Sequence, residues 1–105
     1  MIHAEFEKIH NHFCTVRISG HAGFADAGQD IVCAAVSSAV QYATLLITET
    51  FHEKEEESDK NGVAFFRLCH PEKGNGSKVI EGLYQHLQFI SEDYPNTIEI
   101  IVTEV

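Results

Sequence analysis

The sequence predicts an α+β protein: a two-layer sandwich in which a four-stranded sheet carries two helices packed on one face. Two kinds of apolar spacing support this prediction. Four short segments have an apolar residue at every second position, and two longer segments have apolar residues three and four positions apart. The segments follow one another in the order β-β-α-β-α-β. A chain of 105 residues that is 44% hydrophobic and 22% charged has the size and composition of one soluble domain.

The first two segments predict a β-hairpin. Every second residue is apolar in each of them, which is the pattern of a half-buried strand. These apolar positions are Ile2, Ala4 and Phe6 in the first segment and Cys14, Val16 and Ile18 in the second. The short polar link "HNH" between the segments suits a hairpin turn.

The first helix is expected to begin near Asp30, a residue type that favours the N-cap, and to run to about residue 51. Its apolar stripe consists of Val32, Val36, Ala39, Val40, Ala43 and Ile47. No charged residue occurs between Asp30 and Glu49, so the segment is long enough to span a membrane. Polar residues such as Ser38 and Gln41, and the lack of flanking basic residues, favour a helix buried in a small domain instead.

The second half of the chain completes the predicted sandwich. The run "EKEEESDKNG" is interpreted as an acidic, solvated turn, and "GVAFFRLCH" as a third strand that Pro71 ends. Ser77 is a candidate cap for the second helix, and "DYPNT" turns the chain into the last strand. The apolar positions of these elements are Val79, Ile80, Leu83, Leu87 and Ile90 in the helix and Ile98, Ile100 and Val102 in the strand.

Charge and cysteine content exclude several classes of protein. The net charge of -9, with seven basic residues and no basic run, argues against a nucleic-acid surface and suits a basic macromolecular partner. Three cysteines without a CxxC pair do not form a disulfide framework. The start "MIHAEFEKIH" lacks the pattern of a secretory signal, so a cytoplasmic protein without a membrane partner is expected.

The stretch "SGHAGFADAGQDIVCAAVSSAV" carries the strongest candidate for chemistry. If Asp30 caps the helix, Cys33 lies in its first turn, where free N–H groups and the helix dipole favour a thiolate. His21, in the glycine-rich loop before the helix, could accept a proton from this thiol and return it later. Alternatively, Cys33 is a small hydrophobic residue of the core. The residues alone leave both readings open.

Three further features of the sequence could support a catalytic role of Cys33. Asp30 either caps the helix, which is favoured, or orients His21 as the third member of a triad. Ser37 lies one turn after Cys33 and either hydrogen-bonds near the sulfur or packs. Glycines of the loop, Gly20 and Gly23 among them, either bring backbone N–H groups to a substrate carbonyl or only turn the chain.

Metal and nucleotide sites are not expected. Three of the seven histidines, His3, His10 and His12, fall near one hairpin, but HExxH and paired CxxC motifs are absent. The glycine spacing of the loop also differs from a dinucleotide fingerprint and from a Walker loop. We therefore expect neither a metal nor a cofactor.

The run "GHAGFADAGQDIVCAAVS" resembles the signature of the ribosomal-processing cysteine protease family, Prp. The resemblance lies in the Gly-His-Ala-Gly start, in the Gly-x-Asp-Ile-Val-Cys-Ala-Ala-Val-Ser end and in the spacing between them. Outside the loop and first helix, the resemblance lies in the length, the acidic charge and the order of elements and not in a residue motif. Phe24 departs from the tyrosine expected there, and Asp26-Ala27 from an acidic-aromatic pair.

The resemblance implies a cytoplasmic endopeptidase, with residues 1–105 forming a single cysteine-protease domain. Such enzymes remove the N-terminal extension of a large-subunit ribosomal protein whose tail reaches towards the peptidyl-transferase centre. The family's nucleophile falls on Cys33 and its general acid and base on His21. A pocket for aromatic side chains, a homodimer and a mobile loop over the site (residues 20–29) are also implied. Substrate contacts are expected at Gly20, Gly23, Phe24 and Ser37.

Two other functions remain open from the sequence. A non-catalytic module that binds a ribosomal protein during assembly would retain binding without cleavage. A thiol redox sensor would need only a reactive Cys33, which would oxidise readily while no peptide is cut.

Overall fold

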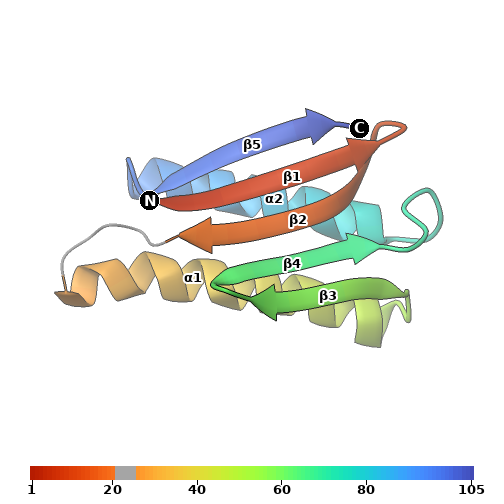
Figure 1. The fold of residues 1–105 in the computed structure, drawn as a ribbon, viewed down its shortest axis with the longest axis horizontal. Coiled ribbons are helices and arrows are strands. Elements are labelled where there is room, and N and C mark those ends of the chain that lie inside the picture. The colour runs from red at the N-terminus through yellow and green to blue at the C-terminus, as the bar shows by residue number, and fades with distance from the viewer. Residues whose placement is uncertain (21–25) are drawn as a thin grey trace.

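Five strands form one sheet within the described part of the chain, and both helices lie behind that sheet in the view of Figure 1. The computed structural model describes the backbone of residues 1–20 and 26–105 and the side chains of residues 1–20 and 31–105. The sheet order is β3-β4-β2-β1-β5. In chain order the elements are β1 (Ile2–Ile9), β2 (His12–Gly20), α1 (Asp26–Leu45), a π-helical turn η1 (Leu46–Thr50), β3 (Glu55–Lys60), β4 (Val63–Leu68), α2 (Gly76–Asp93) and β5 (Ile98–Glu104).

The predicted hairpin of the first two strands is confirmed. Strands β1 and β2 pair in antiparallel fashion, and the turn residues His10 and Asn11 have φ angles of 49° and 65°. Two successive positive φ angles are typical of the tight turn whose twist matches that of the strands. On its other side, β1 pairs in parallel with β5, so that Ile2 lies opposite Ile98. The first and last strands of the chain are therefore neighbours.

The prediction of a four-stranded sheet is wrong, because the acidic run before Val63 is a fifth strand and not a solvated turn. Strand β3 pairs with β4 in antiparallel fashion and forms one edge of the sheet. Asn61 and Gly62 make the turn between them, with φ angles of 56° and 76°. An Asn-Gly pair is a strong hairpin signal, and an edge strand does not need apolar residues on both faces. The element order is therefore β-β-α-β-β-α-β.

The core lies between the helices and one face of the sheet. The apolar stripes predicted for both helices are confirmed: their buried side chains are Val32, Val36, Ala43 and Ile47 in the first helical segment and Ile80, Leu83, Leu87 and Ile90 in the second. The buried residues of the sheet that belong to the same cluster are Ile2, Ala4, Phe6, Phe13, Val16, Phe66, Leu68 and Ile98. By length and hydropathy alone Ile31–Thr50 could cross a membrane, but here its apolar stripe contributes to this core.

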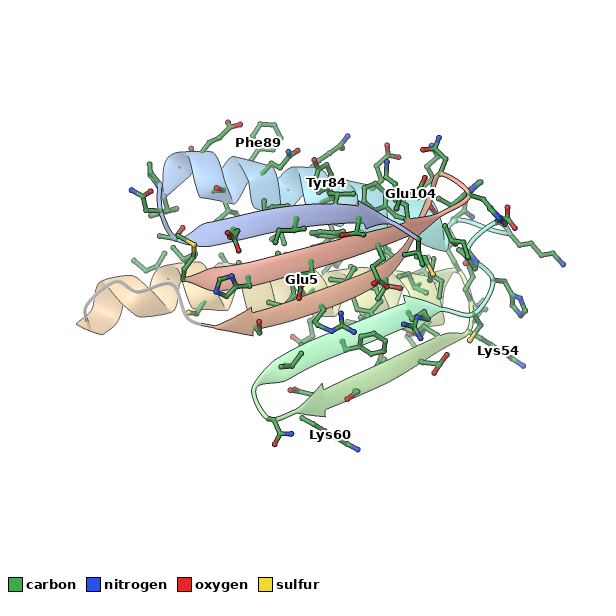
Figure 2. All side chains as sticks on the ribbon, turned by 45° about the horizontal axis from the view of Figure 1, so that its top comes forward. Glu5, Lys54, Lys60, Tyr84, Phe89 and Glu104 are labelled. Carbon is green, nitrogen blue, oxygen red and sulfur yellow. The ribbon has the colours of Figure 1, made fainter. Side chains whose placement is uncertain are left out.

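The opposite face of the sheet carries polar side chains. In Figure 2, Glu5 of β1 projects from this face, away from the helices. On the same face, His3 Nδ1 lies 3.0 Å from Glu99 Oε1 across the β1–β5 pair. The β3–β4 hairpin, with Lys60 at its tip, lies at one edge of the sheet. The helix-bearing face is therefore the one that can enclose a groove.

Helix α1 begins at Asp26, so the prediction that Asp30 caps it is wrong. Ala27 and Gln29 favour helix, and an aspartate suits a helix start because of the dipole. The glycine at position 28 does not stop the helix. As a result Asp30 lies inside the helix, and Cys33 lies about two turns from its start rather than in the first turn.

The start of α2 is capped by a residue distant in sequence, and the prediction that Ser77 caps it is wrong. Asn75 is the N-cap residue but makes no side-chain capping bond. Instead the Glu53 carboxylate accepts hydrogen bonds from the backbone N–H of Asn75 (2.6 Å to Oε2) and of Gly76 (3.0 Å to the same oxygen). A Cβ atom at Gly74 or Gly76 would approach this carboxylate to 2.6 or 2.8 Å. Glycine at both positions makes room for the cap.

Replacing Glu53 should destabilise the fold. Glu53→Ala leaves two helix-start N–H groups without their acceptor and should lower the free energy of unfolding by about 1–2 kcal/mol. Glu53→Gln keeps one acceptor oxygen and should cost less. The control is Glu56→Ala, an exposed glutamate of β3. Urea unfolding measures all three variants, and equal stability of Glu53→Ala and Glu56→Ala would contradict the capping role.

Glu55 should make stability depend on pH. Both of its carboxylate oxygens are enclosed. Burial is the largest cause that raises the pKa of Glu55 from 4.5 to about 8, and a hydrogen bond with Glu57 and the negative charge of Glu57 raise it further. The folded state therefore holds a proton that the unfolded state has lost, and the free energy of unfolding falls as pH rises from about 4.5 to about 8.

Glu55→Gln, which is neutral at every pH, should lose this dependence. We expect the free energy of unfolding of Glu55→Gln to exceed that of the wild type by about 1–2 kcal/mol at pH 8 and to equal it near pH 4.5. The difference at pH 8 is kept small because solvent still reaches the side chain of Glu55 and screens its charge. Unfolding by urea at both pH values measures the difference. The exposed neighbour Glu56→Gln is the control, and a Glu55→Gln stability curve parallel to that of the wild type would refute the assignment.

Candidate active site

Cys33 lies on the edge of the core. Its side chain is half-buried and packs against the buried cluster. It is therefore a core neighbour and at the same time partly accessible, as a nucleophile must be. The effect of a helix dipole is confined to the first turn, so the position of Cys33 removes the predicted stabilisation of a thiolate by the helix start. Activation of this thiol would need another group.

Gly20 ends β2 in a conformation that only glycine adopts without strain. Its φ angle is +84°, and it pairs with Ile2 across the hairpin. A Cβ atom here would collide with the Met1 carbonyl oxygen and come within 3.3 Å of His3 Cδ2. The absence of a side chain thus sets the direction in which the chain leaves the sheet, immediately before His21.

The other predicted residues of the glycine-rich loop cannot be placed. His21, Gly23 and Phe24 lie outside the described residues, as does the side chain of Asp30. The flanking elements are described: Figure 1 shows the end of β2 and the start of α1 at the same end of the sheet. The histidine–cysteine pair, the orienting role of Asp30 and the oxyanion-binding glycines remain predictions.

A groove of about 460 Å³ runs between α1 and the strands β2, β4 and β3. The residues that line it are Ile18, Val36, Ser37, Val40, Gln41, Thr44, Glu57, Ser58, Asp59, Ala64, Phe65 and Phe66. Those from α1 follow Cys33 by three, four, seven, eight and eleven positions, which is one continuous stripe of a helix. The groove therefore extends along α1 from the turn that carries Cys33. Ser37, for which a hydrogen bond near the sulfur and simple packing were the two alternatives, is exposed at the near end of the groove.

The acidic residues of this groove were not among the residues predicted for the site. Glu57 and Asp59 belong to the run that was interpreted as a solvated turn. Only the Asn-Gly turn at residues 61–62 indicated that this run folds back along a strand, and with it that alternate residues would face the helix.

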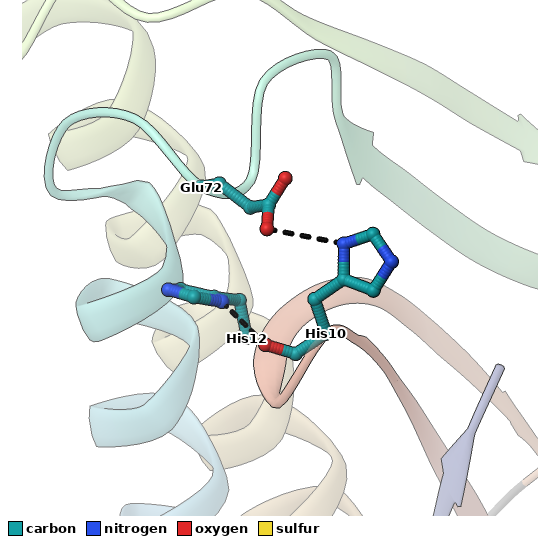
Figure 3. Close-up of polar contacts among 3 residues, drawn as sticks. All are labelled: His10, His12 and Glu72. Atoms are coloured by element: carbon teal, nitrogen blue, oxygen red, sulfur yellow. Dashed lines mark hydrogen bonds and ion pairs between the residues drawn. The ribbon is translucent and has the colours of Figure 1, made fainter.

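The histidines of the first hairpin do not converge on a common point. His10 Nδ1 lies 3.1 Å from Glu72 Oε1, whereas His12 Nδ1 donates to the His10 carbonyl oxygen at 2.8 Å (Figure 3). His3 is paired with Glu99 at the other end of β1. Among the described residues no group of three His, Cys, Asp or Glu side chains is arranged to hold a metal ion.

Comparison with known proteins identifies the family. The profile of the family described as cysteine protease Prp matches residues 1–99. The chain belongs to the Prp family. It is also 28% identical to the ribosomal processing cysteine protease Prp of Bacillus subtilis over 107 aligned positions, covering 95% of this chain and 96% of that protein.

Solved structures of Prp share the fold. The essential ribosomal processing protease Prp from S. aureus, in complex with a covalently linked product peptide, superposes with a TM-score of 0.86. That match covers 97% of this chain and 99% of the other at 23% identity. The same S. aureus protease with a substrate peptide gives a TM-score of 0.85 at 22% identity, with the same coverage. The five-stranded α+β architecture is thus that of Prp proteases.

Substitution of Gly20 should strain the exit from β2. Gly20→Ala places a methyl group against the Met1 carbonyl and forces a left-handed backbone on alanine, so the free energy of unfolding should fall by about 1–3 kcal/mol. The control is Gly82→Ala: this glycine lies in α2, a Cβ atom there would have nothing within 4 Å, and the variant should gain up to about 1 kcal/mol. Thermal unfolding compares the two, and a Gly20→Ala variant as stable as the wild type would contradict the assignment.

Proposed function

We propose that this chain is a cytoplasmic cysteine endopeptidase that supports ribosome maturation. Its substrate is the N-terminal extension of the large-subunit ribosomal protein whose tail reaches the peptidyl-transferase centre. Residues 1–105 act as a single protease domain within a homodimer. The observation that carries the proposal is the position of Cys33 in a chain of the Prp family: its side chain is half-buried, one helical turn before Ser37, where the groove begins.

The proposed reaction has two steps. The Cys33 thiolate attacks the scissile carbonyl carbon, and backbone N–H groups of the loop that contains Gly20 and Gly23 hold the oxyanion. His21, having taken the thiol proton, gives it to the leaving amine as the C–N bond breaks. Water then attacks the thioester, with His21 as base, and releases the new carboxylate and the thiol. Neither a metal nor a cofactor takes part.

Activation of the thiol rests on His21 in this mechanism. Cys33 lies beyond the first turn of α1, so the helix dipole contributes little to a thiolate there. An imidazolium next to the sulfur would supply the missing stabilisation as an ion pair. Asp30 is a candidate to orient His21, and Phe24 and Ser37 are candidates to contact the substrate.

The charge of the chain agrees with the proposed substrate. A net charge of -9 would attract a basic ribosomal protein and repel the phosphates of RNA. We therefore assign the protein rather than the nucleic-acid component of the ribosome as the partner.

Mass spectrometry of a peptide that copies the extended N-terminus of the ribosomal protein tests the proposal. Wild type should cut the peptide at one bond, whereas Cys33→Ala should not cut it, because no nucleophile remains. His21→Ala should be slowed by at least about 100-fold, the usual contribution of a general acid and base. Ser38→Ala, an exposed helix residue, serves as the active control.

The other outcomes separate the alternatives. An intact peptide that still binds to wild type and to Cys33→Ala equally would favour a non-catalytic module for binding the ribosomal protein. An intact peptide together with rapid oxidation of Cys33 by peroxide would favour a redox sensor. Either result would overturn the protease assignment.

A further inference from the structure

The groove beside α1 is long enough to hold a peptide segment. From Cys33 to Thr44 the helix advances by about 16 Å, at about 1.5 Å per residue. An extended peptide covers that length with about five residues, at about 3.3 Å each. Consider a substrate that follows the groove and has its scissile bond at the Cys33 sulfur. The third to fifth residues from that bond would then lie between two walls: the part of α1 from Val40 to Thr44, and strand β3.

The two walls of the groove differ in chemistry. The inner surface is apolar and includes Ile18, Val36 and Phe66. The outer wall is strand β3, where the register sets Glu57 opposite Phe66 and Asp59 opposite Ala64. Since residues opposite one another in an antiparallel pair lie on the same face, both carboxylates are on the helix side of the strand.

A ligand can reach both of these carboxylates. Both side chains are exposed, and neither takes part in any of the ion pairs formed among residues 1–20 and 31–105. Glu57 also shares a hydrogen bond with the carboxyl group of its neighbour Glu55. Among the residues that the structure describes, those that line the groove include no lysine, arginine or histidine. An apolar floor with an anionic outer wall fits a side chain that has an aliphatic stem and a positive end, which describes lysine and arginine.

We propose that this groove, with Glu57 and Asp59, is a specificity subsite that selects peptides with a lysine or arginine three to five residues from the scissile bond. The proposal rests on the proposed protease function and adds to it a preference that belongs to this site. The occupant is thus a basic peptide segment that lies extended along α1, its cationic side chain directed towards β3.

Kinetics on matched peptides test the subsite. The starting peptide is the extended N-terminus of the proposed substrate, in which each position from the fifth before to the fifth after the scissile bond is set to lysine or to glutamate in turn. At one or more positions three to five residues from the bond, wild type should have a kcat/KM about tenfold higher for lysine than for glutamate. The Glu57→Gln/Asp59→Asn double variant should reduce this ratio to about twofold or less.

Two further variants make the test specific. Glu56→Gln removes the same charge from the same strand, but on the face turned away from α1, and should keep the wild-type ratio. Glu57→Lys should reverse the preference, so that the glutamate peptide becomes the better substrate. The ratio compares two peptides on one protein sample, so partial unfolding of a variant does not change it.

Each outcome bears on one of the two proposals. If wild type cuts every peptide with equal kcat/KM for lysine and glutamate, the subsite proposal is overturned and the protease proposal stands. The same holds if Glu56→Gln loses the preference for lysine as fully as the Glu57→Gln/Asp59→Asn double variant does. If wild type cuts no peptide, the protease proposal fails. Binding of the same peptides to Cys33→Ala, measured by fluorescence anisotropy, then tests whether the groove selects a basic side chain. Tighter binding of lysine peptides, lost on adding the Glu57→Gln/Asp59→Asn pair, would support the subsite; equal binding would overturn it.

Discussion

The rotation of α1 about its own axis is the constraint on which the site depends. Val32, Val36 and Ala43 are buried in the core, and a close-packed interior allows little rotation of the helix that supplies them. Successive residues lie about 100° apart around a helix, so burial of Val32 sets where Cys33 points. The result is a thiol at the margin of the core, half-covered and half-open. The same rotation turns the stripe from Ser37 to Thr44 towards the β3–β4 hairpin and so creates the groove.

The far wall of the groove is held by a second interaction. The Glu53 carboxylate binds the first N–H groups of α2, two residues before β3 begins. One side chain thus connects the end of the first helical segment, the start of the second and the entry to the edge strand. An anion is well placed there because the free N–H groups and the dipole of a helix start both favour negative charge. The start of the acidic strand is therefore attached to the core, while Lys60 at the tip of the hairpin is exposed to solvent.

Most of the fold could be predicted from the sequence, because the buried faces repeat with regular periods. Two apolar stripes, Val32 to Ile47 and Val79 to Ile90, were sufficient for the two helices. The alternation in β1, β2 and β5 and the apolar run that becomes β4 were sufficient for four strands. Strand β3 was missed because its six residues are all polar, and an edge strand is specified by its turn and its partner rather than by burial. For the site, Cys33 and Ser37 could be assigned to one helical stripe. The groove and its acidic wall could not, since they exist only after α1 is packed beside a hairpin that begins after the helix has ended.

The parallel pairing of β1 with β5 has a kinetic consequence. Ile2 lies opposite Ile98, and the Ile2 N–H donates to the Thr97 carbonyl at 2.8 Å, so β1 gains its second neighbour only from residues almost a full chain length away. Closing so long a loop is entropically costly, and contacts of this separation slow folding. During synthesis β1 and β2 can form a hairpin early, yet one edge of that hairpin stays open until β5 has left the ribosome. An intermediate with an unpaired strand edge is prone to association, so the hairpin is open to pairing with another chain until β5 is in place.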